Sequence, residues 1–182
     1  MRRVAMQQIG LLLVFICMGT LLRAKEQKPL QTVTHVDLSR YLGHWYEYAR
    51  YPNRFEKACT ANAQALYTLR SAIKIGVRNE CSDQNGKPKV SEGWAKIADT
   101  RTNAKLRVTF FWPFYGDYWV IGLDPEYRWA LVGEPKRRYL WILTRTPTLD
   151  SETYREIGRL ATEHGYDASR LVRTPQHQHQ QQ

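Results

Sequence analysis

Residues 59–81 read CTANAQALYTLRSAIKIGVRNEC, and this stretch decides the fold. Residues 61–69 carry Ala61, Ala63, Ala65, Tyr67 and Leu69 at every second position, and apolar residues alternate again from Ile73 onward. A period of two is typical of β-strands that bury one face. Residues 70–72 between the two runs are few enough for a tight turn, so the stretch predicts an antiparallel hairpin.

The two cysteines of this stretch lie nearly opposite each other, one bulge away from the register of the predicted hairpin. Cys59 and Cys81 both have odd numbers, so their side chains face the same side of the sheet. We predict a Cys59–Cys81 disulfide. The alternative is a pair of buried thiols in a reducing compartment.

Six more strands surround the hairpin in the sequence, at regular spacing and mostly with connections of hairpin length. They are expected over residues 44–50, 90–98, 105–111, 118–123, 129–133 and 139–145. Eight such strands predict an antiparallel barrel or sandwich. No internal repeat of fixed period is present.

One helix is expected near the end of the chain. Thr148 or Asp150 can cap it, and Gly165 can end it. Its apolar stripe consists of Tyr154, Ile157, Leu160 and Ala161. A short strand over residues 169–173 is expected to follow the helix.

The N-terminus has the pattern of a secretory signal peptide. Arg2 and Arg3 precede a run of apolar or small residues over 9–18, which is too short for a membrane span. We predict a signal peptide over residues 1–24, with a non-cleaved anchor as the alternative. Cys17 is a candidate for lipidation, although the bulk of Ile16 before it argues against processing.

Composition favours one folded domain, expected over residues 25–175, followed by a disordered Gln/His-rich tail over 176–182. The chain has 27 Lys and Arg against 17 Asp and Glu, a net charge of +10, and 43% hydrophobic residues. The signal peptide and the lack of a recognition motif argue against nucleic acid, so the charge favours anionic lipid surfaces. His177 and His179 could contact a metal, but a solvated tail is the preferred interpretation.

Motifs of the common enzyme classes are missing from the sequence. It contains no P-loop, no G-x-S-x-G, no H-E-x-x-H and no C-x-x-C. We therefore predict a protein that is not an enzyme and that has no cofactor and no metal site.

Three segments in order resemble the lipocalin family. Residues 43–47 (GHWYE) match the G-x-W of the first strand, 114–124 (FYGDYWVIGLD) resemble the second conserved region, and 140–147 (LWILTRTP) carry the third with its Arg. The resemblance covers about residues 35–175 and is closest to the bacterial outer-membrane lipocalins, relatives of apolipoprotein D. It implies an eight-stranded, up-and-down barrel with one C-terminal α-helix packed outside.

In such a barrel the first and last strands are neighbours, and Gly43, Trp45 and Arg145 lie together at the closed base. The Arg145 guanidinium can then stack on the Trp45 indole. We predict a structural role for these three residues, because lipocalins close their base in this way.

The interior of the barrel is expected to hold one small ligand. No charged cluster is obviously forced inside it, and Glu47 and Asp117 are candidates for buried carboxylates. Small or apolar residues at alternate positions are the candidates for the cavity wall, and aromatic residues of the fifth connection are candidates for the mouth. These ligand-binding candidates are Ala63, Ala65, Tyr67, Gly93, Ala95, Val108, Phe110, Trp112, Phe114, Tyr118, Val120 and Trp141.

The rim of the barrel combines these aromatic residues with cations of the first and seventh connections, such as Arg54, Lys57 and residues 136–138. Such a rim suits a membrane interface or an anionic head group. The sequence thus predicts a carrier or store of a small amphipathic lipid, either a fatty acid or a lysophospholipid. We expect an exported protein of the periplasm or outer membrane of a Gram-negative bacterium, which could form a homodimer. The alternatives are an interaction module with a filled barrel and a lipocalin-like enzyme.

Overall fold

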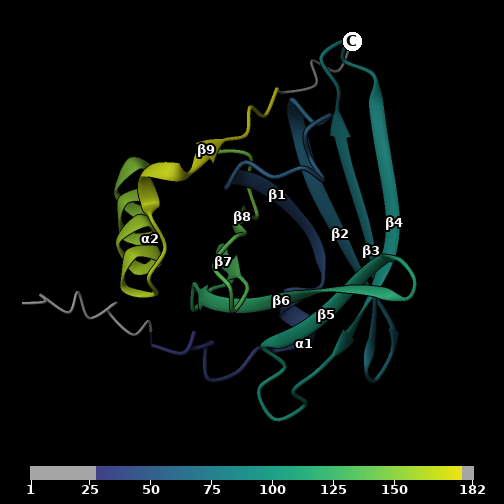
Figure 1. Cartoon of the computed structure of the whole chain (residues 1–182), viewed down its shortest axis with the longest axis vertical. Coiled ribbons are helices and arrows are strands. Elements are labelled where there is room, and N and C mark those ends of the chain that lie inside the picture. Colours follow the sequence, from purple (N-terminus) through teal and green to yellow (C-terminus); the bar gives the residue numbers. More distant parts are fainter. Residues whose placement is uncertain (1–27, 178–182) are drawn as a thin grey trace, which may run out of the picture.

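The computed structural model describes residues 28–177 (Figure 1). The predicted signal peptide, Cys17 and most of the predicted tail, including His179, lie outside the described residues. The helices are α1 (Leu38–Tyr41), α2 (Ser151–Glu163) and the 3₁₀ helix η1 (Ala168–Arg170). The strands are β1 (Gly43–Arg50), β2 (Ala61–Ser71), β3 (Lys74–Ser82), β4 (Pro88–Ile97), β5 (Lys105–Phe111), β6 (Phe114–Leu123), β7 (Trp129–Gly133), β8 (Leu140–Thr144) and β9 (Val172–Arg173).

Eight antiparallel strands form a closed barrel, as predicted. The strands pair in chain order from β2 to β8, β8 pairs with β1, and β1 also pairs with β2. The closure runs from Gly43 opposite Tyr67 to Tyr46 opposite Gln64. Beyond this point β2 leaves β1, and β9 pairs instead with Ala49 and Arg50 at the end of β1.

The hairpin of β2 and β3 is present, but its turn differs from the prediction. Ala72 and Ile73 form the turn, and Tyr67 faces Val77. Ile73 was predicted to begin the second strand, but it lies in the turn and is exposed. Its hydrophobicity was misleading because a two-residue turn joins the strands most directly.

The predicted disulfide between Cys59 and Cys81 is present, with Cα atoms 5.5 Å apart. Cys81 is a buried residue of β3, whereas Cys59 lies just before β2 in the loop that follows β1. The disulfide therefore attaches this loop to the barrel wall.

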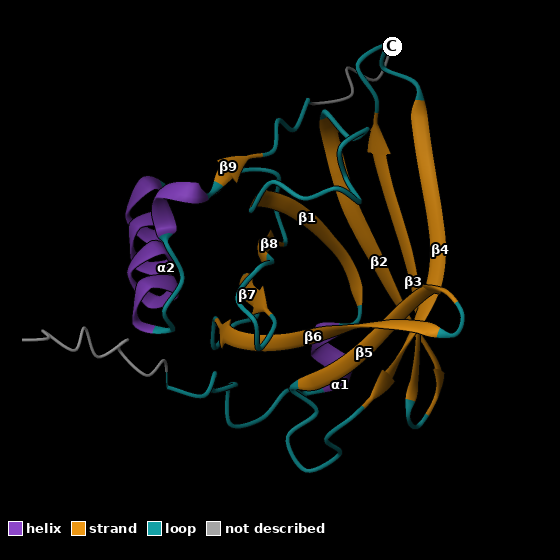
Figure 2. Cartoon of the chain, in the orientation of Figure 1, coloured by secondary structure: helices purple, strands orange, loops and turns teal. Residues whose placement is uncertain are grey.

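Two apolar cores lie on either side of the barrel wall. The first lies inside the barrel and includes Trp45, Tyr67 and Val120. The second lies between the barrel and α2, where Ile157 and Ala161 of the helix are fully buried. Figure 2 shows α2 outside the strands, as the sequence predicts.

Local signals define the ends of α2. The Asp150 side chain accepts hydrogen bonds from the backbone N–H groups of Glu152 and Thr153, and so satisfies two donors of the first turn. Gly165, with a φ of +82°, follows the helix in the left-handed conformation typical of a helix end. Asp150 rather than Thr148 is thus the N-cap.

The base of the barrel is closed by the predicted contact between Arg145 and Trp45. The guanidinium lies 3.8 Å from the centre of the indole ring. It also donates to the carbonyl oxygens of His44 (2.6 Å), Leu42 (3.0 Å) and Arg40. Gly43 has a φ of +91°, and a Cβ there would lie only 3.6 Å from Arg145. Its conformation favours glycine, and the guanidinium passes directly beside it.

Candidate ligand-binding site

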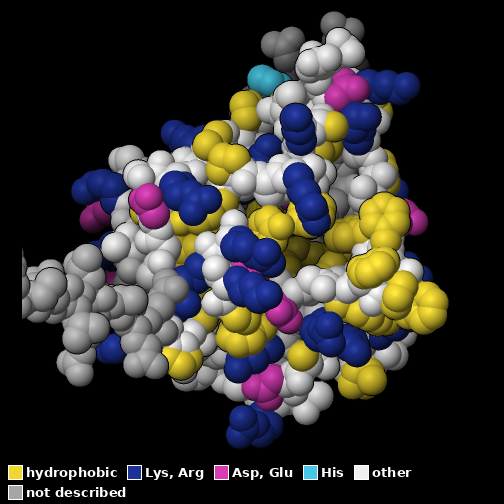
Figure 3. Space-filling view, in the orientation of Figure 1, with side chains coloured by type: hydrophobic (Ala, Val, Ile, Leu, Met, Phe, Trp, Pro, Cys, Tyr) yellow, Lys and Arg dark blue, Asp and Glu magenta, His cyan; other side chains and the backbone are white. Residues whose placement is uncertain are grey.

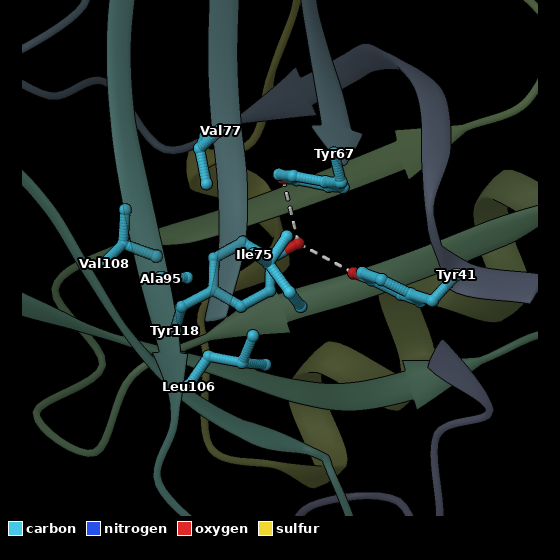
Figure 4. A pocket seen from close by; sticks show the side chains of 8 residues that line it. All are labelled: Tyr41, Tyr67, Ile75, Val77, Ala95, Leu106, Val108 and Tyr118. Carbon is cyan, nitrogen blue, oxygen red and sulfur yellow. Dashed lines mark hydrogen bonds between the residues drawn. The ribbon is translucent and has the colours of Figure 1, made fainter. Parts of the chain in front are cut away.

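A pocket opens inside the barrel, above the closed base. It is about 240 Å³ in volume, counted together with the part that is open to solvent. Figure 4 shows the side chains around it. The lining residues are Tyr41, Tyr67, Ile75, Val77, Ala95, Leu106, Val108 and Tyr118. Five of these are aliphatic and three are tyrosines, so the pocket offers apolar walls and a few hydroxyl groups.

Four of the twelve predicted ligand-binding candidates line this pocket: Tyr67, Ala95, Val108 and Tyr118. Ala63, Ala65, Phe110, Val120 and Trp141 are buried or half-buried elsewhere in the barrel. Among the residues that the candidate list missed, Ile75 and Val77 follow the same alternation as the hairpin. Tyr41 had no such signal, because it lies in the short helix α1 before the first strand.

Gly93 faces the barrel interior, and its lack of a side chain accommodates the neighbouring strand. A Cβ at this position would lie 2.2 Å from the carbonyl oxygen of Thr109 and 2.9 Å from the Phe110 ring. The glycine therefore allows β4 and β5 to approach each other closely. This close approach occupies the space beside Gly93, and a contact of Gly93 with a ligand stays a prediction.

Three tyrosine hydroxyls form a chain in the pocket. Tyr118 lies between the other two, with its oxygen 2.7 Å from that of Tyr41 and 3.1 Å from that of Tyr67. Burial raises the pKa of Tyr67 to about 12 and the pKa of Tyr41 and Tyr118 well above the usual value. All three hydroxyls are consequently protonated and neutral at physiological pH.

A charged cluster lies inside the wall of the barrel near its mouth, and it contains the buried carboxylate of Glu47. Arg50 donates to Glu47 (2.6 Å) and to Glu56 (2.8 Å), and Trp141 donates from its indole nitrogen to Glu56 (3.1 Å). Glu47 also accepts a hydrogen bond from the buried Thr174 hydroxyl, and Arg50 donates to the carbonyl oxygen of Cys59.

A bulge in β1 brings these charges together. The register between β1 and β8 shifts between Glu47 and Ala49. Without the bulge, Glu47 and Arg50 would face opposite sides of the wall, because their numbers differ by three. Strand alternation could not reveal the cluster, since Glu56 and Thr174 come from a loop and from the C-terminal segment.

The carboxylate of Glu47 is buried within the cluster. Burial and, secondarily, the negative charge of Glu56 raise its pKa from 4.5 to about 7, against the opposing effect of Arg50. Glu47 thus changes its protonation state near neutral pH. The cluster carries one more negative than positive charge only when both carboxylates are ionised.

The turn between β5 and β6 presents large aromatic side chains to solvent. Trp112 is 77% exposed and Phe114 is 78% exposed, with Phe111 beside them at 80%. Trp112 and Phe114 therefore lie at the mouth end of the barrel and are not part of the cavity wall. Figure 3 shows a hydrophobic patch on this side of a hollow in the surface, with Lys and Arg side chains around it.

The cations of the rim differ in their surroundings. Arg137 donates to the carbonyl oxygens of His164 and Lys28, both at 2.6 Å, so it connects the barrel to α2 and to the N-terminal segment. Arg138 lies over Tyr139 and Arg54 over Phe55. Arg137 is thus structural, whereas Arg54 and Arg138 extend the aromatic rim with positive charge.

Residues 28–177 contain neither a metal-binding group nor a membrane-spanning helix. In that part of the chain, no group of three or more His, Cys, Asp or Glu side chains could hold a metal ion. No helix between these limits is long and apolar enough to cross a bilayer.

A sequence profile described as "Lipocalin-like domain" matches residues 36–176. The chain is a lipocalin. This match agrees with the resemblance of the three segments and with the barrel, its closed base and the helix outside it.

Proteins of bacteria, plants and animals are similar to this lipocalin. It is 45% identical over 146 residues to the outer membrane lipoprotein Blc of Escherichia coli K12, covering 80% of this chain and 82% of that protein. It is 43% identical over 159 residues to temperature-induced lipocalin-1 of Arabidopsis thaliana, covering 83% and 85%. Among solved structures, insecticyanin of Manduca sexta has a TM-score of 0.68 at 22% identity, covering 83% and 86%.

Proposed function

We propose that this lipocalin stores or transports a single-chain amphipathic lipid, a fatty acid or a lysophospholipid, at the outer membrane of a Gram-negative bacterium. The observation that carries this proposal is the apolar pocket in a barrel that is closed at its base. Each methylene group that a lipid chain buries there would contribute about 0.8 kcal/mol before the entropic costs of binding.

The charges near the mouth favour one head group over the other. When Glu47 is ionised, Glu47 and Glu56 together outnumber the single positive charge of Arg50, so an additional carboxylate at this place would be repelled. A zwitterionic head group can place its cation near the carboxylates and its phosphate near the solvent. Among the two lipid classes, the cluster therefore favours a lysophospholipid.

The exposed aromatic turn supports contact with a membrane during lipid loading. Trp112, Phe111 and Phe114 lie next to one another at the tip of β5 and β6. Aromatic side chains are favoured at the interface between membrane and water, and cations such as Arg54 and Arg138 suit anionic lipid. We infer that the mouth of the barrel faces the membrane.

The proposed location rests on the relatives and on the N-terminal sequence. Relatives in three bacterial genera are named outer membrane lipoproteins. The apolar run over 9–18 fits export. The disulfide fits an oxidising compartment as well. Acylation of Cys17 would anchor the protein to that membrane and is part of this proposal. We further propose that the protein is not an enzyme.

Mass spectrometry of the protein from a bacterial envelope fraction tests the proposal. In the native spectrum, the mass in excess of the polypeptide gives the bound lipid and the oligomeric state, including the homodimer. In the denaturing spectrum, the mass gives the mature N-terminus and any acyl groups. We expect one fatty acid or lysophospholipid per barrel. A bare barrel that also binds no added lysophosphatidylethanolamine would refute the carrier function.

One observation favours the alternative of an interaction module with a filled barrel. The enclosed part of the pocket has a volume of only about 10 Å³, far below the roughly 300–1,000 Å³ of sites that bury small ligands. A titration with lysophospholipid separates the two functions, because a carrier saturates at one lipid per barrel whereas a filled barrel takes up none.

A further inference from the structure

The tyrosine chain at the bottom of the pocket contains one hydroxyl proton more than its internal hydrogen bonds use. Each of Tyr41, Tyr67 and Tyr118 has one O–H donor, and two hydrogen bonds join the three oxygens. In the described part of the chain, these hydroxyls have no other hydrogen-bond partner. One O–H therefore remains available in every arrangement of the protons.

This donor is buried among apolar side chains. Tyr41 is 3% exposed and Tyr67 9% exposed, and the neighbouring lining residues are Ile75, Val77, Ala95, Leu106 and Val108. An unsatisfied buried donor is costly, so most of them have a partner. Figure 4 shows the three rings converging within the pocket, with their oxygens close together.

We propose that the tyrosine chain binds a neutral oxygen atom, a hydroxyl or carbonyl, at the buried end of the ligand. This inference rests on the proposed function, because it assumes that a single-chain lipid enters the barrel. It goes further by assigning chemistry to the end of the lipid that lies deepest. A ligand hydroxyl can accept a hydrogen bond from the available O–H and donate one hydrogen bond to a tyrosine oxygen.

The surroundings favour a neutral oxygen over a carboxylate. None of the eight lining side chains is charged. The nearest guanidinium at the base, Arg145, lies against the Trp45 ring and donates to three backbone carbonyls. An ionised group without a partner is much more costly to bury than a hydroxyl with one.

The experiment compares two lipids that differ only at the chain end, hexadecanoic acid and 16-hydroxyhexadecanoic acid. Their dissociation constants are measured by competition against a fluorescent fatty acid, with the wild-type protein and with the triple variant Tyr41→Phe/Tyr67→Phe/Tyr118→Phe. The variant keeps the three rings and removes all three hydroxyls. Replacing every partner of a hydrogen-bonded group by apolar atoms of similar shape is close to neutral for stability.

We expect the triple variant to bind 16-hydroxyhexadecanoic acid about 5- to 150-fold more weakly than the wild type, which corresponds to one buried hydroxyl left without a partner. Its affinity for hexadecanoic acid should stay the same or rise. In a crystal structure with the hydroxylated lipid, an oxygen of the ligand should lie within hydrogen-bond distance of a tyrosine hydroxyl.

Tyr154→Phe is the matched control. It removes a tyrosine hydroxyl between the barrel and α2, outside the pocket, and should leave both affinities unchanged. Melting curves of both variants verify that they are folded. If the triple variant fails to fold, the crystal structure of the wild-type complex with 16-hydroxyhexadecanoic acid takes its place.

The outcomes separate the two proposals. If both lipids bind and the ratio of their affinities is the same in the wild type and in the variant, the tyrosine chain does not recognise an oxygen. A water molecule that occupies the site in the lipid complex would overturn the inference as well. If neither lipid binds to the folded wild type, both the carrier function and the inference fail.

Discussion

Replacing Arg145 by Ala should destabilise the barrel and leave the lipid cavity intact. The substitution removes the guanidinium 3.8 Å from the Trp45 ring, together with its hydrogen bonds to the carbonyl oxygens of His44, Leu42 and Arg40. The cation–π contact contributes about 0.5–2 kcal/mol. Because Arg145 is only half-buried, water can replace part of its hydrogen bonding.

We therefore expect the free energy of unfolding to fall by about 2–4 kcal/mol, a decrease in Tm of about 5–15 °C. Urea unfolding at several protein concentrations measures this loss, and a lipid titration of the same samples measures affinity. Arg145→Lys should lie between the wild type and the Ala variant, because a lysine keeps the charge but cannot contact three carbonyls at once. Unchanged melting with abolished lipid binding would refute the structural role of Arg145.

Three further substitutions test other parts of the protein. Glu47→Gln should remove a pH dependence of stability. Because the pKa of Glu47 is raised to about 7, the folded wild type binds a proton more tightly than the unfolded state does. Wild-type stability should therefore fall by about 3 kcal/mol as the pH rises from 4.5 to 7. Urea unfolding from pH 5 to 8 checks this, and a wild-type curve that is flat over this range would contradict it. Trp112→Ser should change stability by less than about 0.5 kcal/mol and weaken binding to anionic vesicles in a sedimentation assay; equal binding would exclude the rim as a membrane contact. Cys59→Ala/Cys81→Ala should lower the unfolding free energy by about 3 kcal/mol, as expected for a loop of this length. Thermal melting with and without reductant checks this, and an unchanged Tm would contradict it.

The alternation of residues along the chain was sufficient to predict the strands of the barrel. Strand β5 and strand β7 have the predicted bounds, and most other strands differ by one or two residues. β6 begins at Phe114 rather than at residue 118, because only Trp112 and Pro113 join it to β5. Local patterns thus identify strands well and describe turns less well.

The closed base could also be predicted, since Trp45 and Arg145 lie in motifs with a known place in the fold. The cavity was predicted in part. Alternation assigned Tyr67, Ala95 and Val108 to its wall, but it could not tell that the β5 backbone fills the space beside Gly93.

The charged cluster near the mouth could not have been found from the sequence alone. Glu47 and Thr174 are separated by 127 residues, and Arg50 faces the interior only because β1 contains a bulge. The same is true of the tyrosine chain, in which Tyr41 from a short helix meets Tyr67 and Tyr118 from two strands.

Short-range periodicity, the pair of cysteines and the order of the motifs therefore specified the barrel, its disulfide and its helix, because these depend on neighbouring residues and on chain order. The folded chain decided which polar groups meet inside the barrel and which aromatic residues face solvent. Contacts of this kind depend on register, bulges and loop paths, and they involve residues that are distant in the sequence.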